Sequence, residues 1–176
     1  SDGDNKINLT VSVPMVGSMT ADRHGIGLHN GELAFDGGNF LVKVDGDSVG
    51  SVNRRIGIEM AAGSNLDIKA DNIWIEANEH ALFIPATSGS SNPVARDVTN
   101  TAKFAADSIV LKGGTGITSK LETKFYKTKN FIEFTGETLI DAAVKGDSVF
   151  ADIDGGRAID VMATNITFNN KTTLLS

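Results

Sequence analysis

The amino-acid sequence predicts an all-β fold and, within that class, a right-handed parallel β-helix (a solenoid) with short insertions. Short runs of alternating apolar residues recur along the chain, beginning with residues 7–13, and Gly, Asn, Asp or Ser separate them. The apolar residues are mainly Val, Ile, Leu and Ala, and only 6% of the chain is aromatic. This composition suits stacked layers of branched side chains, which a solenoid core requires.

A degenerate unit also recurs, in which a small or polar pair precedes Asn or Ser and then an apolar strand. The intervals between successive copies are 33, 36, 22 and 35 residues. Repeats of this length that contain short strands and no long helix are typical of solenoids. The first apolar residues of the copies are Phe40, Ile73, Ile109, Phe131 and Ile166.

A second repeat begins with the letters GDSV in residues 46–60 and again in residues 146–162. Each copy continues through a polar loop with Arg to an alternating apolar strand, and then to a strand led by Asn65 or Asn165. Because the agreement extends beyond four common letters, we expect each copy to mark the entry into a new coil.

An antiparallel β-sandwich or jelly roll remains the alternative, because both folds also show short strands at regular intervals. Two-residue turns in such folds often use Asn-Gly or Asp-Gly. Dipeptides of this kind lie close together at Asn30-Gly31, Asp36-Gly37 and Asp45-Gly46.

Two segments interrupt the strand pattern. Residues 91–107 open with Asn92 as a helix N-cap and Pro93 in the first turn, and a helical stripe of apolar residues follows. This pattern predicts a short helix, and residues 137–148 predict a further helical turn.

The length of 176 residues and the mass of 18.5 kDa suit a single β domain with a sizeable core. Residues 1–23 are expected to form an N-terminal strand and cap region, and residues 24–176 the solenoid-like repeats, with an insertion near residues 85–107. Since the chain starts at Ser1 rather than Met, we expect a mature or excised form.

Composition excludes several classes of function. The net charge of −6, without a run of Lys or Arg, disfavours nucleic acid and anionic membranes as partners. No apolar run approaches the length needed to insert into a membrane. The absence of Cys excludes disulfides, thiol catalysis and cysteine metal sites.

Residues 69–84 (KADNIWIEANEHALFI) and 155–170 (GGRAIDVMATNITFNN) resemble units of secreted bacterial parallel β-helix proteins, above all autotransporter passenger domains and related adhesins. The resemblance is one of style over residues 24–176. It implies a right-handed parallel β-helix displayed outside the cell or on the bacterial surface, often as an adhesin or a stalk. The lack of Cys agrees with this resemblance.

Trp74 and Tyr126 are the candidate binding residues, since they are the only Trp and Tyr of the chain. Trp74 lies between Ile73 and Ile75, so it faces outward if its neighbours face the core. An exposed indole is a platform on which sugars stack.

Asp152 and Asp154 form a candidate calcium site, because Asp at alternate positions followed by Gly can present oxygen ligands. No other cofactor is expected. His24 and His29 are five residues apart, which would put them on opposite faces of an extended strand, so we expect them to be polar rim residues.

These observations favour a non-enzymatic module for adhesion or binding, whose partner is a glycan or protein of a host or neighbouring cell. The alternative is a structural subunit of an extracellular fibre, filament or phage tail appendage, in which residues 7–13 self-associate with a neighbour's strand edge. A third hypothesis is a polysaccharide-active enzyme, with an acid and a base drawn from Asp152, Asp154 and Glu59.

Overall fold

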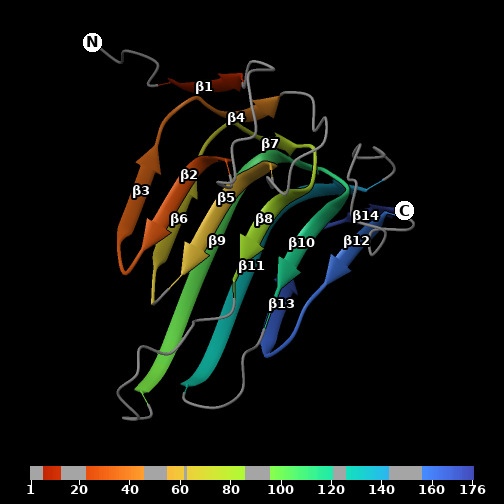
Figure 1. Cartoon of the computed structure of the whole chain (residues 1–176). Coiled ribbons are helices and arrows are strands. Elements are labelled where there is room, and N and C mark those ends of the chain that lie inside the picture. Colours follow the sequence, from red (N-terminus) through yellow and green to blue (C-terminus); the bar gives the residue numbers. More distant parts are fainter. Residues whose placement is uncertain are drawn as a thin grey trace, which may run out of the picture.

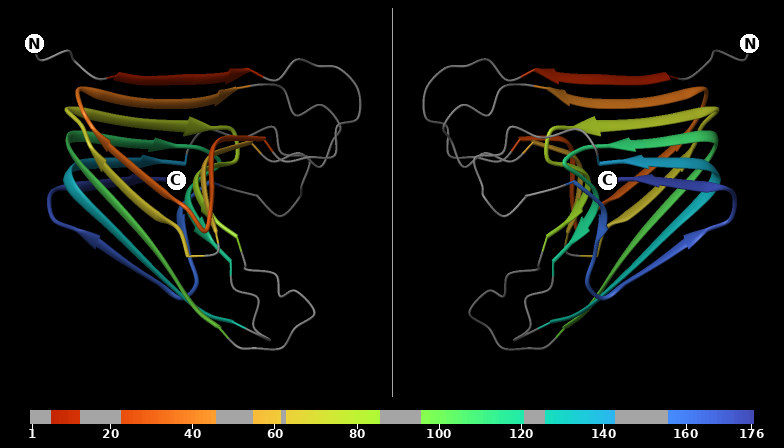
Figure 2. Two further views of the ribbon diagram at one scale, coloured as in Figure 1. Left: turned by 90° about the vertical axis from the view of Figure 1, so that its left-hand side faces the viewer. Right: turned by 90° about the vertical axis from the view of Figure 1, so that its right-hand side faces the viewer.

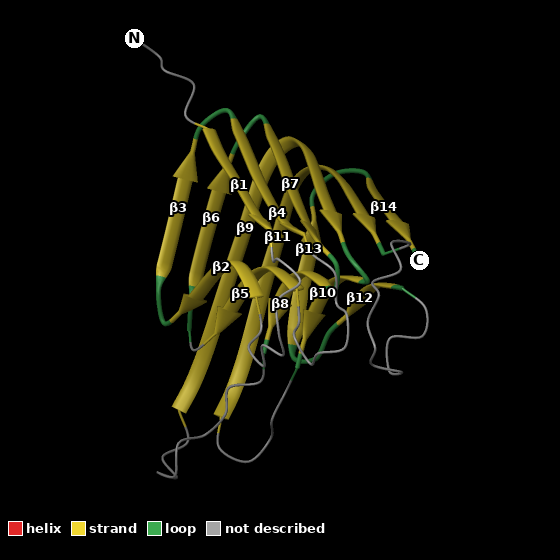
Figure 3. Ribbon diagram, turned by 45° about the horizontal axis from the view of Figure 1, so that its top comes forward, coloured by secondary structure: helices red, strands yellow, loops and turns green. Residues whose placement is uncertain are grey.

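The computed structural model describes residues 6–12, 23–45, 55–61, 63–85, 96–120, 126–142 and 156–176. In these residues the regular secondary structure is entirely β, as Figure 3 shows, and the pairings between strands are parallel. No helix in the described part of the chain could cross a membrane.

The strands form a nine-stranded sheet and a five-stranded sheet, here called the larger and the smaller sheet. The smaller sheet contains β2 (Arg23–His29), β5 (Arg55–Ala61), β8 (His80–Ile84), β10 (Thr115–Ser119) and β12 (Arg157–Asp160). The larger sheet contains β1 (Lys6–Ser12), β3 (Glu32–Asp36), β4 (Asn39–Asp45), β6 (Asn65–Lys69), β7 (Asn72–Ala77), β9 (Arg96–Lys112), β11 (Tyr126–Asp141), β13 (Thr164–Phe168) and β14 (Thr172–Leu175).

The chain winds as a parallel β-solenoid, as the sequence predicts. Each coil supplies one strand to the smaller sheet and then crosses the larger sheet, in the order β2–β3–β4, β5–β6–β7, β8–β9, β10–β11 and β12–β13–β14 (Figure 1). Seen along the axis from the β3 side, in the left panel of Figure 2, the chain turns clockwise as successive coils recede. The winding is therefore right-handed, as parallel crossovers generally are.

The larger sheet bends into two arms (Figure 2). The lower arm holds β3, β6, β13 and the first halves of β9 and β11, and the upper arm holds β1, β4, β7, β14 and the second halves of β9 and β11. Asn30-Gly31 and Asp36-Gly37 lie at corners between consecutive strands. Each of these strands pairs in parallel with a strand of another coil, so the hairpins of the alternative sandwich fold do not form there.

The first repeat predicted from the sequence is real but spans both arms. Phe40, Ile73 and Ile109 stack in register in the upper arm, where all three are buried. In the lower arm, however, Phe131 pairs with Asn165 and is 41% exposed, so it faces solvent. A strand motif predicts that alternate residues face opposite sides of the sheet. It does not predict which arm the strand joins or which set of residues faces the core.

The second repeat is confirmed by the strands that follow the GDSV letters. Asn65 and Asn165 occupy one column of the lower arm, linked through Thr101 and Phe131. The strands β5–β6 and β12–β13 are thus equivalent parts of different coils. The GDSV letters themselves lie outside the described residues.

The helix predicted over residues 91–107 is wrong, because residues 96–112 form β9. Residues 91–95 lie outside the described part. In β9 the alternate side chains of Ala102 and Phe104 enter the core, and Asn100 joins a buried chain of amides. Stacking on both neighbouring coils outweighs a weak local helix propensity. The helical turn expected at residues 137–148 is likewise a strand as far as Asp141.

The core is built from columns of like side chains. Phe104 and Phe134 stack with ring centroids 5.1 Å apart, and Phe134 and Phe168 with centroids 5.2 Å apart. Each coil thus extends the aromatic stack of the coil before it, and this stack lies between the larger and the smaller sheet.

Candidate functional site

The outer face of the upper arm is the most distinctive surface of the described chain. Its middle column is apolar and contains Trp74, which is 37% exposed and therefore faces outward, as predicted. A charged column runs on one side and a polar column on the other, and we call the three columns together the Trp74 face. The apolar column is Leu41, Trp74, Val110 and Leu139; the charged column is Lys43, Glu76, Lys112 and Asp141; the polar column is Asn39, Asn72, Ser108 and Glu137.

The indole of Trp74 is held in place by its neighbours. Its Nε1–H donates a hydrogen bond to Oε2 of Glu76 at 2.9 Å, and the ammonium of Lys112 lies 5.4 Å from the ring centroid. Lys43 Nζ lies 3.8 Å from Glu76 Oε1, and Lys112 Nζ lies 4.0 Å from Asp141 Oδ2. The ring is thus an oriented aromatic platform between charged groups rather than a loose side chain.

A groove of about 560 Å³ follows the bend of the larger sheet, beside the polar column. Asp71 and Asp107 lie opposite each other in adjacent coils there, since Asn72 pairs with Ser108 in the next rung. Small residues leave room for a ligand, and carboxylates exceed ammonium groups in the lining. The lining residues are Asp36, Gly37, Lys69, Ala70, Asp71, Ala105, Ala106, Asp107, Thr135, Gly136 and Asn170.

The polar column connects the groove with the apolar column. Asn72 Nδ2 donates to Asn39 Oδ1 at 2.9 Å across neighbouring rungs. Groove, amides and indole therefore form one continuous outer surface that crosses several coils. Hydrogen-bonding groups on one side and an aromatic plane on the other are the elements of a sugar-binding surface.

A second polar cluster lies on the outer face of the smaller sheet. Nε2 of His24 lies 3.1 Å from Oε2 of Glu59, and Nε2 of His29 lies 3.0 Å from Oε1. The Glu59 side chain is only 8% exposed. Burial raises the pKa of Glu59, but the hydrogen bonds and charges of His24 and His29 outweigh it, so the pKa lies below its ordinary value of 4.5.

The two histidines share a face because the strand turns inward twice in succession. A Cβ on Gly25 would lie 2.5 Å from Cγ1 of Val42, so Gly25 points into the core, and the next residue, Ile26, also packs there. Because Gly25 and Ile26 both point inward, the alternation is shifted by one residue, and His24 and His29 both lie on the outer face. The expectation that the two lie on opposite faces is therefore wrong, since it assumed unbroken alternation.

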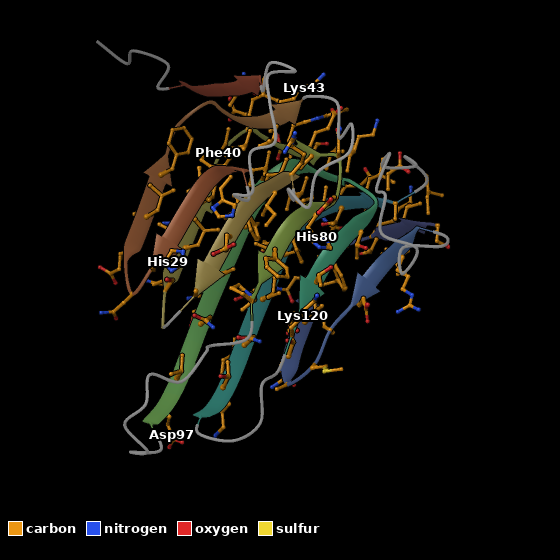
Figure 4. All side chains as sticks on the ribbon, in the orientation of Figure 1. His29, Phe40, Lys43, His80, Asp97 and Lys120 are labelled. Carbon is orange, nitrogen blue, oxygen red and sulfur yellow. The ribbon has the colours of Figure 1, made fainter. Side chains whose placement is uncertain are left out.

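The third histidine of the chain lies on the same outer face. His80 Nδ1 forms a hydrogen bond with Thr118 Oγ1 at 3.1 Å, and its ring stacks on Phe83 with centroids 4.9 Å apart. Figure 4 labels His29 on β2 and His80 on β8, both in the smaller sheet. All three histidines thus lie on the smaller sheet, away from the Trp74 face.

The remaining predicted site residues are only partly described. Tyr126 begins β11, and nothing of its side chain is described. Asp152 and Asp154 lie outside the described residues, so the calcium site stays a prediction. Among the residues that the structure does describe, no group of three or more His, Asp or Glu could hold a metal ion. Asp160 pairs with Arg157, with a distance of 3.0 Å between Oδ2 of Asp160 and Nη1 of Arg157.

Sequence reasoning missed the groove. Its signal was nevertheless present in the first repeat, in which Asp71 precedes Asn72 and Asp107 precedes Ser108. Only the stacking of coils shows that these carboxylates line one surface.

Comparisons of the chain with protein-family models, with curated proteins and with solved structures find no match.

Proposed function

We propose that this chain is a non-enzymatic, secreted or surface-displayed β-solenoid module that binds glycans on the Trp74 face. The observation that carries the proposal is the outward, anchored position of Trp74 beside an open polar groove. The apolar C–H face of a sugar stacks on an indole, and its hydroxyls donate to carboxylates such as those of the groove. The extracellular location rests on the resemblance of the repeats to secreted β-helix proteins.

The charges of the groove narrow the class of glycan. Asp36, Asp71 and Asp107 outnumber the single lysine of the lining, Lys69. A polyanionic polysaccharide would be repelled there, whereas neutral or amino-bearing sugars would not. Strands repeat every ~4.8 Å along the axis, so an extended glycan on this surface meets the same columns in each coil.

A glycan array tests the proposal, with the purified chain and a Trp74→Ala variant. Loss of the stacking platform is expected to weaken binding about tenfold, equivalent to about 1.4 kcal/mol. Phe131→Ala is the matched control, because Phe131 is an exposed aromatic residue of similar accessibility on the other arm. Equal binding by Trp74→Ala and the parent chain would contradict the proposed site.

Binding to whole cells separates a glycan from a protein partner. Periodate treatment of the target cells oxidises sugars and is expected to abolish binding, whereas protease treatment that leaves glycolipids intact is not. The opposite pattern would favour a protein ligand and contradict a glycan. If the chain released new reducing ends from a polysaccharide that it binds, it would be an enzyme, and the proposed non-enzymatic role would be contradicted.

A further inference from the structure

The last coil of the described chain ends in a flat surface with three free strand edges. β12, β13 and β14 each pair with one neighbour, β10 or β11, and all three belong to the same coil. The opposite end is stepped, because β1 covers β4, whereas β2 and β3 have a described strand on one side only. We call the flat surface, which lies at the far end of the coil axis from β3 in Figure 1, the β12–β14 end.

Apolar side chains are less covered at the β12–β14 end than one coil further in. Ile140 is fully buried, whereas Leu174, the next residue of its column, is 50% exposed. Phe134 is also fully buried, whereas Phe168, which follows it, is only partly buried. Five large apolar side chains are exposed in the described residues, and three of them belong to this coil: Met162, Leu174 and Leu175. Exposed apolar groups gathered in one region mark a binding surface.

The backbone of β13 leaves hydrogen-bonding groups free at this end. The carbonyl oxygen of Ala163, just before β13, accepts from the N–H of Asn130 in β11 at 3.0 Å, so odd-numbered residues face β11. Because the backbone groups of successive residues alternate between the two sides of a strand, those of Thr164, Ile166 and Phe168 face the free edge. The edge is therefore a row of donors and acceptors with which another strand can pair.

We propose that the β12–β14 ends of two copies of this chain bind each other across a two-fold axis and form a closed dimer. An axis through the middle of β13 places this strand antiparallel to β13 of the second copy, with Ile166 opposite Ile166 and Thr164 opposite Phe168. This register pairs all three residues whose backbone groups face the free edge. Inward-facing residues meet inward-facing ones, and on the outer face Asn165 lies opposite Thr167.

The same axis supplies partners for the other two strands. Since the chain runs through β12, β13 and β14 in order around the coil, reversal about β13 lays β12 of one copy antiparallel to β14 of the other. Both strands are four residues long, and Figure 2 shows the smaller sheet and the upper arm rising from opposite ends of the lower arm. The backbone groups of Thr172 and Leu174 face the free edge, because the carbonyl oxygens of Lys171 and Leu175 accept from the β11 side. A second copy thus offers a strand to each free edge.

Charge favours a second copy at this end of an otherwise acidic chain. The net charge of the chain is −6, whereas the charged residues of the segment 156–176 are only Arg157, Asp160 and Lys171. Arg157 Nη1 lies 3.0 Å from Asp160 Oδ2, and Lys171 Nζ lies 3.0 Å from Glu137 Oε1. Two copies therefore approach each other through this end without bringing unpaired carboxylates together.

The dimer carries two Trp74 faces. Because the axis places the upper arm of one copy in line with the smaller sheet of the other, the two faces point in different directions. Such a dimer bridges two glycan-bearing surfaces rather than binding one surface twice. This consequence rests on the proposed function, whereas the dimer itself rests only on the β12–β14 end.

Sedimentation velocity over a range of protein concentrations tests the dimer. The parent chain is expected to change from the mass of one copy to that of two as its concentration rises. It is expected to grow no further, because an interface between identical surfaces closes at two copies. A mass that stays at one copy, or that exceeds two copies, would overturn the proposal.

A charge at the β12–β14 end is expected to prevent the dimer. Leu174→Lys changes a side chain that is already half exposed, and this variant is expected to remain a single copy at concentrations where the parent chain is a dimer. Phe131→Lys is the matched control, because Phe131 is 41% exposed but lies on the outer face of the lower arm, and it is expected to dimerise as the parent does. Circular dichroism checks that both variants are folded. Dimerisation of Leu174→Lys to the extent of the parent would overturn the proposal.

Two cysteine variants test the register, since the chain has no Cys of its own. Asn165 and Thr167 are both exposed, and across the proposed dimer they form a directly opposite pair with Cα atoms about 4.5 Å apart. This spacing permits a disulfide, whereas two copies of the same residue lie on a diagonal, about 7–8 Å apart, which is too far.

Under mild oxidation, a mixture of Asn165→Cys and Thr167→Cys chains is therefore expected to form a disulfide-linked dimer, and neither variant alone is expected to do so. If the mixture did not cross-link, or if each variant alone cross-linked as readily as the mixture, the proposed two-fold pairing of β13 would be wrong.

Discussion

Asn100 donates from Nδ2 to Oδ1 of Asn130 at 2.9 Å, and both side chains lie in a site where each residue is only 1% exposed. Oδ1 of Asn100 also accepts from the backbone N–H of Gly63 and of Ser64, each at 3.0 Å. Nδ2 of Asn130 donates to Oγ1 of Thr164 at 3.1 Å. The amides therefore connect successive coils at the corner where the smaller sheet leads into the larger one.

Replacing Asn100 by Ala is expected to destabilise the fold. The change leaves two backbone N–H groups and one amide oxygen without their partners in a buried site, and each such group costs roughly 1–3 kcal/mol. Urea unfolding followed by circular dichroism measures the loss. Asn72→Ala removes the equivalent amide contact of an exposed pair and serves as control, with an expected cost of about 0.5 kcal/mol or less. Equal costs for the two variants would contradict the role of the buried amides.

The Glu59 carboxylate is expected to make stability depend on pH in the acid range. Its pKa in the folded state is lowered, so the folded state favours the ionised form, and this contribution is present above the ordinary value of 4.5. It is lost as pH falls through the lowered pKa, because both states are then protonated. Glu59→Gln should therefore give a smaller decrease in stability below that value than the parent chain shows.

Unfolding midpoints in urea, measured across the acid range, check this prediction. Glu137→Gln is the control, since Glu137 pairs with Lys171 at an exposed site where a salt bridge contributes little. If the stability of Glu59→Gln fell with pH as steeply as that of the parent, the two histidines would not be stabilising this carboxylate.

Local alternation was enough to predict which face Trp74 occupies, because successive residues of a strand point in opposite directions whatever the strand packs against. The same rule failed for His24 and His29, since Gly25 and Ile26 both point inward. The local sequence does not predict these two consecutive inward positions. They follow from the close approach of Gly25 to Val42 on the larger sheet.

The class of fold was predictable because repeated apolar strands of coil length occur throughout the chain. The partners of each strand were not, because the lengths of the intervening loops differ and the sequence does not state which coils stack. The partnership of Glu59 with His24 and His29, which lie 35 and 30 residues earlier in the chain, was therefore not predicted, because only the pairing of β2 with β5 brings these residues together. The misassigned helix has a similar origin, since tertiary stacking decided the structure of residues 96–107.

Gly57 is expected to tolerate no side chain. A Cβ there would lie 2.6 Å from Cγ2 of Ile75 and 2.6 Å from the carbonyl oxygen of Ala81, so the two sheets would have to separate. Gly57→Ala should cost about 1–3 kcal/mol, as overpacking of a tight core generally does. In the neighbouring coil, Gly27→Ala meets its nearest atom, Nδ1 of His24, at 3.5 Å and should be almost neutral. Thermal unfolding of the two variants compares them directly, and similar melting temperatures would contradict this close approach of the sheets.

Phe134 and Phe131 provide the sharpest test of the faces of the lower arm, because they are three residues apart in one strand. Phe134 is fully buried between Phe104 and Phe168, whereas Phe131 is 41% exposed on the outer face. Phe134→Ala should destabilise the fold by about 3–5 kcal/mol, the usual cost of removing a buried aromatic side chain. Phe131→Ala should cost about 1 kcal/mol or less, since most of what it loses is contact with solvent and neighbouring side chains on the surface. Denaturant unfolding of both variants measures the difference, and a larger loss for Phe131→Ala would mean that the strand lies in the opposite phase.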